Sequence, residues 1–151
     1  MFRRRHSRRT PLGHQRIPLS PQVRRALIRA NRLMLDGQFA EAAAIFGRLS
    51  DGVKQRDMPV RAADLVLQAS RAHFAANNVE VALERAREAL RLFVRGDRPG
   101  RVTRVLSRMT TALRDKDYDA EAVQLEQDAV RMLEEMGLSL EEAKQRNAFL
   151  G

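Results

Sequence analysis

Arginine, far more than histidine or cysteine, is the residue type in this chain that could carry chemistry. The 151 residues include no cysteine, which excludes disulfides, thiolate catalysis and zinc sites built on cysteine. His6 and His14 have no carboxylate close to them in sequence, so we predict no metal site around them. His73 occupies a position where the neighbouring repeats have leucine, and it is therefore expected to pack rather than to act as a general base. We expect no enzyme, no cofactor and no bound metal.

Positive charge is concentrated at the amino terminus. Residues 1–35 contain ten arginines and no acidic residue. The whole chain has a net charge of +9, but residues 36–151 have a net charge of only −1. Residues 1–20 contain Pro11, Gly13 and Pro18 and show no helical period, so they are predicted to be a disordered arm. The arginines that could bind a nucleic acid or an anionic membrane surface through this arm are Arg3, Arg4, Arg5, Arg8, Arg9 and Arg16. Only Phe2 could stack on a base, so a solvated tail that aids solubility is the competing interpretation.

The rest of the chain repeats a sequence pattern at a fixed interval. Asp57-Met58-Pro59 and Asp97-Arg98-Pro99 are one such interval apart. Apolar residues at helical spacing follow the turn Asp36-Gly37, and the same spacing returns after Asn77-Asn78. In the segments that precede these turns, small residues recur at the same interval, as Ala30, Ser70 and Thr110. A fixed period of this length is typical of stacked helix pairs.

We therefore predict an all-α fold, a right-handed stack of three antiparallel helix pairs within one domain over residues 21–151. The predicted pairs span about 21–56, 57–96 and 97–137. The repeat is expected to slip by one position in the third pair, because Tyr118 stands one position earlier than Phe39 and Val79 predict. In that pair the residues expected to face inward are Ala122, Val123, Ala129, Val130 and Leu133.

A last short helix is predicted over residues 139–150. Ser139 followed by Glu142 has the spacing of a capping box, which marks a helix start. An open stack needs a more polar element over its last apolar face, and we expect this helix to provide it.

The body of the chain resembles the tetratricopeptide repeat family. The features that carry the resemblance are the small residues of each first helix, the turn from Gly37 to Phe39, and then Ala42 and Phe46. The similarity covers residues 21–136, although the repeat is longer than the roughly 34 residues that are usual in that family. The resemblance implies no intrinsic chemistry. It implies an adaptor that holds a peptide or partner helix in a concave groove lined by the first helix of each pair.

The resemblance also implies which residues line that groove. They are Arg24, Asn31, Gln68, Arg71, Phe74, Arg104, Arg108 and Arg114. Some members of the family bind a terminal carboxylate through a basic residue, two amides and a further basic pair. Asn31 and Gln68 are similar to the amides, and Arg104 and Arg108 to the basic pair, but Leu27 stands where the first basic residue is expected. Arginines in such a groove could fork an acidic peptide bidentately, and the competing interpretation is ordinary solvated charge on helix faces.

The sequence leads to one main hypothesis and two alternatives. The main one is a non-catalytic adaptor or scaffold that binds a peptide or another protein, with acidic partners favoured. One alternative is a nucleic-acid- or ribosome-associated factor that uses the arm, and the other is a homo-oligomeric subunit of a larger assembly. No apolar run approaches the roughly 18 residues of a membrane span. The amino terminus also lacks the apolar segment of a secretory signal, so the expected location is the cytoplasm.

Overall fold

The computed structural model of the chain describes residues 19–150, and side chains as far as Arg146. Of the predicted disordered arm, only Leu19 and Ser20 belong to the described residues. The six arm arginines named above, and the predicted disorder of the arm, lie outside them.

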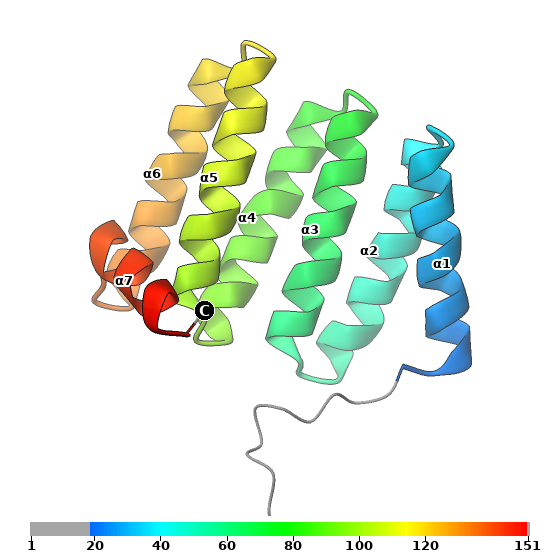
Figure 1. Cartoon of the computed structure of the whole chain (residues 1–151), viewed down its shortest axis with the longest axis horizontal. Coiled ribbons are helices and arrows are strands. Elements are labelled where there is room, and N and C mark those ends of the chain that lie inside the picture. The colour runs from blue at the N-terminus through cyan, green and yellow to red at the C-terminus, as the bar shows by residue number, and fades with distance from the viewer. Residues whose placement is uncertain (1–18, 151) are drawn as a thin grey trace, which may run out of the picture.

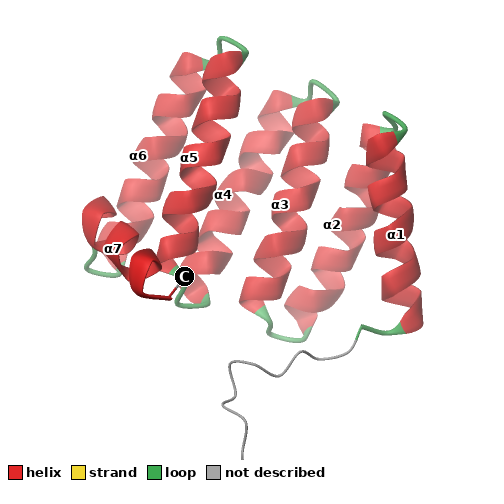
Figure 2. Ribbon diagram, in the orientation of Figure 1, coloured by secondary structure: helices red, strands yellow, loops and turns green. Residues whose placement is uncertain are grey.

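Residues 19–150 are built from helices joined by short turns, with no strand among them (Figure 1). The helices are α1 (Pro21–Leu35), α2 (Phe39–Gln55), α3 (Pro59–Ala75), α4 (Val79–Arg95), α5 (Pro99–Asp115), α6 (Asp119–Glu135) and α7 (Leu140–Leu150). Figure 2 shows that α1, α3 and α5 form one layer and run in the same direction, with α2, α4 and α6 behind them. The prediction of an all-α fold made of packed helix pairs is confirmed.

The turns explain why the helices recur so regularly. From α2 to α6 each helix has 17 residues, and the first residues of these helices are evenly spaced along the sequence. The turn residues with positive φ follow the same even spacing, namely Gly37, Asp57, Asn77, Asp97, Asp117 and Gly137. Glycine, asparagine and aspartate tolerate this left-handed conformation best, so each of these residues ends a helix at a defined place.

The predicted slip at Tyr118 is wrong. Helix α6 begins at Asp119, one full repeat after Val79 at the start of α4. The backbone therefore keeps its register, and only the residue type departs from the pattern. Tyr118 occupies the position before the helix, as Asn78 does in the second pair.

Local sequence signals begin several of the helices. The Val23 amide donates to the Ser20 hydroxyl at 3.2 Å, and Pro21 stands in the first turn of α1. The Glu142 amide donates to the Ser139 hydroxyl at 3.1 Å, so the predicted cap of the last helix is present. Each capped start helps to fix where its helix enters the stack.

Small residues let the helices approach one another closely. Ala42, Ala62 and Ala86 are fully buried, and the Ser70 hydroxyl donates to the Ala82 carbonyl at 2.7 Å. The buried apolar residues form two clusters, one over α1 to α3 and the other over α3 to α7. Helix α3 contributes to both clusters and thereby joins the first pair to the rest.

The carboxyl-terminal end differs from the expectation. Ala122, Ala129 and Leu133 are buried as predicted, but Val123 is 45% exposed, so the prediction that it faces inward is wrong. Leu125, which lay outside the predicted set, is fully buried instead. Helix α7 packs chiefly on α5 and leaves much of α6 uncovered.

Candidate functional site

An ion pair joins α3 and α5 near their amino-terminal ends. The Arg101 guanidinium on α5 bonds to the Asp64 carboxylate on α3, with 2.5 Å between Nη2 and Oδ1. The same guanidinium lies 4.7 Å from the ring centroid of Phe93 on α4, which is a cation–π contact. Arg101 therefore ties the start of α5 to both helices of the preceding pair.

Near the carboxyl-terminal ends of α3 and α5, two aromatic residues are in contact. The ring of Phe74, at the end of α3, meets Tyr118 edge to face, with 6.5 Å between centroids and 67° between planes. The Lys116 ammonium lies 4.6 Å from the centroid of the Phe74 ring. Phe74, which the resemblance implied to line the groove, thus has much of its half-buried ring engaged in packing between the second and third pairs.

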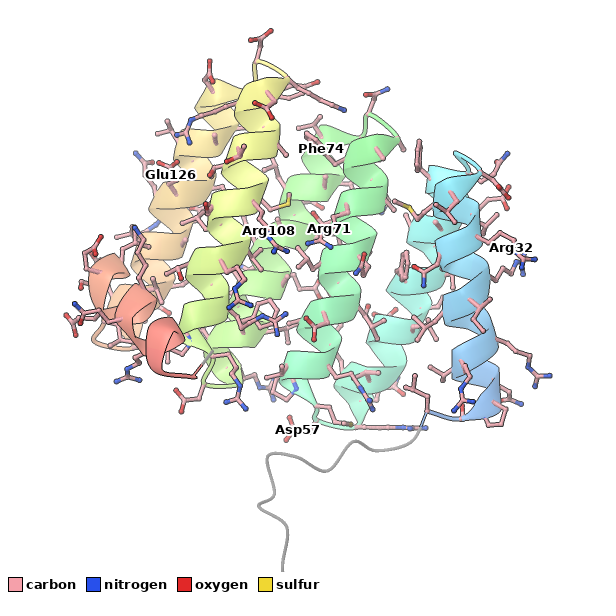
Figure 3. All side chains as sticks on the ribbon, in the orientation of Figure 1. Arg32, Asp57, Arg71, Phe74, Arg108 and Glu126 are labelled. Carbon is pink, nitrogen blue, oxygen red and sulfur yellow. The ribbon has the colours of Figure 1, made fainter. Side chains whose placement is uncertain are left out.

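Three arginines and a glutamine lie between these two contacts. We call Gln68, Arg71, Arg104 and Arg108 the α3–α5 surface. Arg71 and Arg108 each come two helical turns after the bonded pair Asp64 and Arg101, a rise of about 10.5 Å along two parallel helices. Both therefore project toward the same space between α3 and α5, as Figure 3 shows.

Two of the three arginines of the α3–α5 surface lack an acidic neighbour among the described residues. Within the described part of the chain, neither Arg71 nor Arg108 has an acidic partner. Arg108 is exposed and Arg71 is half-buried, while Arg104 makes a contact within the chain. Two guanidiniums brought together without an acid can hold an anion through planar, paired hydrogen bonds.

The remaining residues implied by the resemblance lie elsewhere. Arg24 and Asn31 are exposed on α1, on the side that corresponds to Asp64 and Arg71 on α3. Arg114 bonds to Glu126 of α6 at 2.6 Å, so its charge is used within the third pair.

Two exposed apolar residues on α1 were missed by the sequence reasoning. Ile28 is 55% exposed and Leu35 is 88% exposed. They share a helix side with Arg24 and Asn31, and one repeat further along the chain they correspond to Gln68 and Ala75 of α3. That correspondence was the available signal, because large apolar residues stand at these two positions in α1 and not in α3.

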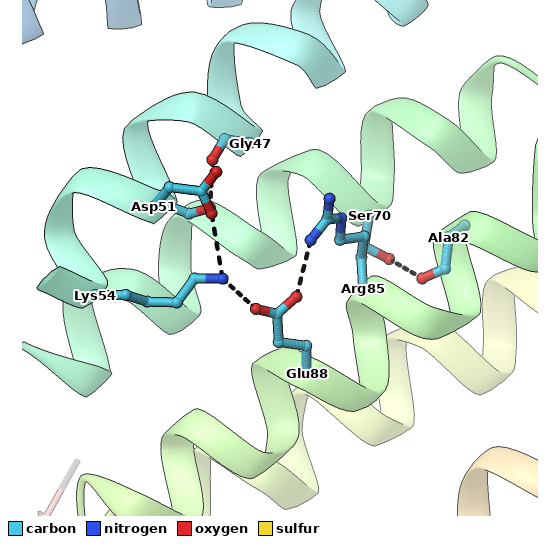
Figure 4. A network of polar contacts seen from close by, with 8 residues as sticks. Gly47, Asp51, Lys54, Ser70, Ala82, Arg85 and Glu88 are labelled. Atoms are coloured by element: carbon cyan, nitrogen blue, oxygen red, sulfur yellow. Dashed lines mark hydrogen bonds and ion pairs between the residues drawn. The ribbon is translucent and has the colours of Figure 1, made fainter.

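In the layer of α2, α4 and α6, several charged side chains are paired with one another. Glu88 of α4 accepts from Lys54 of α2 and from Arg85, as Figure 4 shows. Burial raises the pKa of Glu88, but the hydrogen bonds and charges of Lys54 and Arg85 outweigh this effect and leave that pKa below its usual range. The contact between Lys54 and Glu88 holds adjacent helix pairs together.

Asp128 has the same role between α4 and α6. Arg87 bonds to it at 2.7 Å, and Gln124 and Arg131 also donate to it. Burial raises the pKa of Asp128, and these hydrogen bonds lower it by more, so the pKa lies below its usual range. An open depression of about 530 Å³ lies over this network, and three of the charged residues that line it, Arg87, Asp128 and Arg131, are engaged with one another.

His73 is half-buried in α3. Burial lowers its pKa, and the nearby Arg85 charge lowers it further. Among the described residues, no three histidines, aspartates or glutamates come together as a metal site. Within the same residues, no helix has both the length and the apolar content that a bilayer crossing needs.

Replacing His73 by leucine, the residue of the other two pairs, is expected to flatten the pH dependence of stability. A lowered folded-state pKa means that the unfolded chain binds the proton more tightly, so stability is lost as the pH falls below about 6.5. We expect His73→Leu to remove this loss and to add roughly 0.5–1 kcal/mol at pH 7 by apolar burial. Urea titrations from about pH 5 to pH 8 measure both effects. Equal pH slopes for the two proteins would contradict the assignment to His73.

No family model, curated protein or solved structure matches the chain.

Proposed function

We propose that the chain is a non-catalytic interaction module that holds an acidic segment of another protein on the α3–α5 surface. The observation that carries the proposal is the convergence of Arg71 and Arg108 without an acidic partner among the described residues. The layer of α2, α4 and α6 supports it by contrast, since Lys54, Glu88, Arg87 and Asp128 there are engaged in ion pairs between helices.

The partner would gain orientation from the arginines and further affinity from apolar contacts on the same layer. Ile28 and Leu35 are large exposed apolar residues on α1, and they lie on the side that corresponds to the α3–α5 surface. An acidic segment that also carries aliphatic side chains would match both the arginines of the α3–α5 surface and the apolar residues of α1. The stack would be a right-handed superhelix of the tetratricopeptide type, in which the layer of α1, α3 and α5 is concave.

Peptides selected on the full chain from a phage-displayed random library test this proposal. We expect the selected peptides to be rich in aspartate and glutamate and to bind more weakly as salt is raised. The double variant Arg71→Glu/Arg108→Glu should weaken their binding by about a hundredfold or more. The reason is the loss of two charge-assisted contacts, each of about 1.5–3 kcal/mol.

The matched control is Arg48→Glu/Arg56→Glu, which makes the same change of charge at two exposed positions of α2 and its cap. It should bind the selected peptides as the unaltered chain does, and both variants should melt normally. Selected peptides without acidic residues, or equal losses in the two variants, would refute the proposal.

A further inference from the structure

The amino-terminal end of the stack presents a row of arginines. Helix α1 contains no acidic residue, and Arg25, Arg29 and Arg32 recur at a spacing that places them on one exposed side. Arg32 points away from the rest of the stack in Figure 3. Within the described residues none of the three forms an ion pair. We call these three residues the basic end.

The opposite end is acidic with an apolar centre. Residues 117–151 contain nine acidic and three basic residues, a net charge of −6. On α6 one stripe combines the exposed Val123 with Gln127, Val130 and Glu134, which line an open hollow. In the described part of the chain, Glu134 has no basic partner. We call Val123, Gln127, Val130 and Glu134 the acidic end.

The two ends also lack complementary neighbours. Inside the stack, α3 packs on α2 and α5 packs on α4, so each of these two helices rests on the helix before it. Helix α1 has no such helix before it among the described residues. The acidic end of α6 has no helix over it there, because α7 packs chiefly on α5. Each end could therefore supply what the other lacks.

We infer that the basic end of one copy docks on the acidic end of a second copy. The aliphatic stems of the arginines cover Val123 and Val130, and their guanidiniums meet Glu134 and the surrounding negative charge. Contact between two basic ends is disfavoured by like charge, so the copies associate head to tail rather than symmetrically. Such a contact continues from copy to copy and produces a series of oligomers. This surface is separate from the α3–α5 surface of the proposed function.

Sedimentation velocity of the full chain tests the inference. The mass should rise above that of the 17.2 kDa monomer between about 1 and 200 µM protein, and the rise should shrink between about 50 and 500 mM salt. A basic-end variant, Arg25→Glu/Arg29→Glu/Arg32→Glu, and an acidic-end variant, Gln127→Lys/Glu134→Lys, should each remain monomeric. All five positions are exposed, so the variants should keep the unaltered melting curve.

Mixing the two variants gives the decisive measurement. Each variant has like charges at its two ends, but the ends of the two variants are opposite, so the mixture should associate again. The variant Arg71→Glu/Arg108→Glu should associate as the unaltered chain does, which separates this contact from the proposed function.

Several results would overturn the inference. They are a monomer at the highest concentration in low salt, association that survives in the basic-end variant, or a mixture that stays monomeric. A chain that stays monomeric yet binds single-stranded RNA through the basic end would also overturn it, because the arginines would then serve a phosphate backbone.

Discussion

Replacing Ala42 by glutamate is expected to unfold the pair of α1 and α2. Ala42 is fully inaccessible and belongs to the same buried cluster as Ala30 and Phe46. A carboxylate at this position would lose its hydration without gaining a partner, at a cost of several kcal/mol. That cost is comparable with the total stability of a small domain. Circular dichroism should show a loss of helical signal at 25 °C or a much lower melting temperature.

A matched control lies close by on the same helix. Ala44 is exposed, so Ala44→Glu makes the same chemical change without burying a charge, and its melt should stay close to that of the unaltered chain. Hydrogen exchange adds a spatial readout. The α1–α2 pair should lose protection before α4 to α6, because helical stacks are stabilised by contacts between neighbouring units. Identical melts for the two variants would mean that Ala42 is not in the core.

The sequence contained enough to predict the helices, and the reason is local. A residue that accepts positive φ stands at each turn, and an apolar stripe at helical spacing lies between turns. The predicted slip at Tyr118 is wrong because that expectation follows residue type and treats this aromatic residue as the equivalent of Phe39. The turn at Asp117 sets the register instead, since its backbone closes as the others do.

Neighbour relations at the ends were harder to predict. A helical stripe shows which side of a helix is apolar, but it does not show whether another helix covers that side. Val123 continues an apolar pattern and nevertheless lies 45% exposed, because α7 packs chiefly on α5. Ile28 and Leu35 were missed for a related reason, since an apolar residue on a terminal helix can remain uncovered by any neighbouring helix.

The candidate site was predictable in part. The repeat brings the equivalent sides of α3 and α5 into one layer, so Arg71 and Arg108 could be placed on the same side from the sequence. The sequence could not show which charges are neutralised, because their neutralisation depends on ion pairs between helices. Arg114 is engaged by Glu126, and Asp64 accepts from Arg101 rather than from a residue of its own helix.

Replacing Phe93 by alanine is expected to be the most damaging truncation in the second half of the stack. Phe93 is fully buried in α4 and belongs to the cluster that spans α3 to α7. Its removal should cost about 3–5 kcal/mol, through lost apolar burial and the cavity left behind. The Arg101 guanidinium would also lose the ring that it covers, and with it part of the link between α4 and α5. Urea unfolding measures the loss, and Phe93→Leu should cost much less because it leaves a smaller void.

The region that loosens in Phe93→Ala distinguishes two views of how the stack holds together. If Arg101 and Phe93 are a principal link between the second and third pairs, hydrogen exchange should accelerate in α5 and α6 as well as in α4. The link is credible because Arg101 is also the residue that reaches Asp64 on α3, so one side chain connects three helices. Faster exchange confined to α3 and α4 would show instead that the third pair is held by other contacts, such as Arg87 with Asp128. In that case Asp128→Ala, rather than Phe93→Ala, should release the third pair.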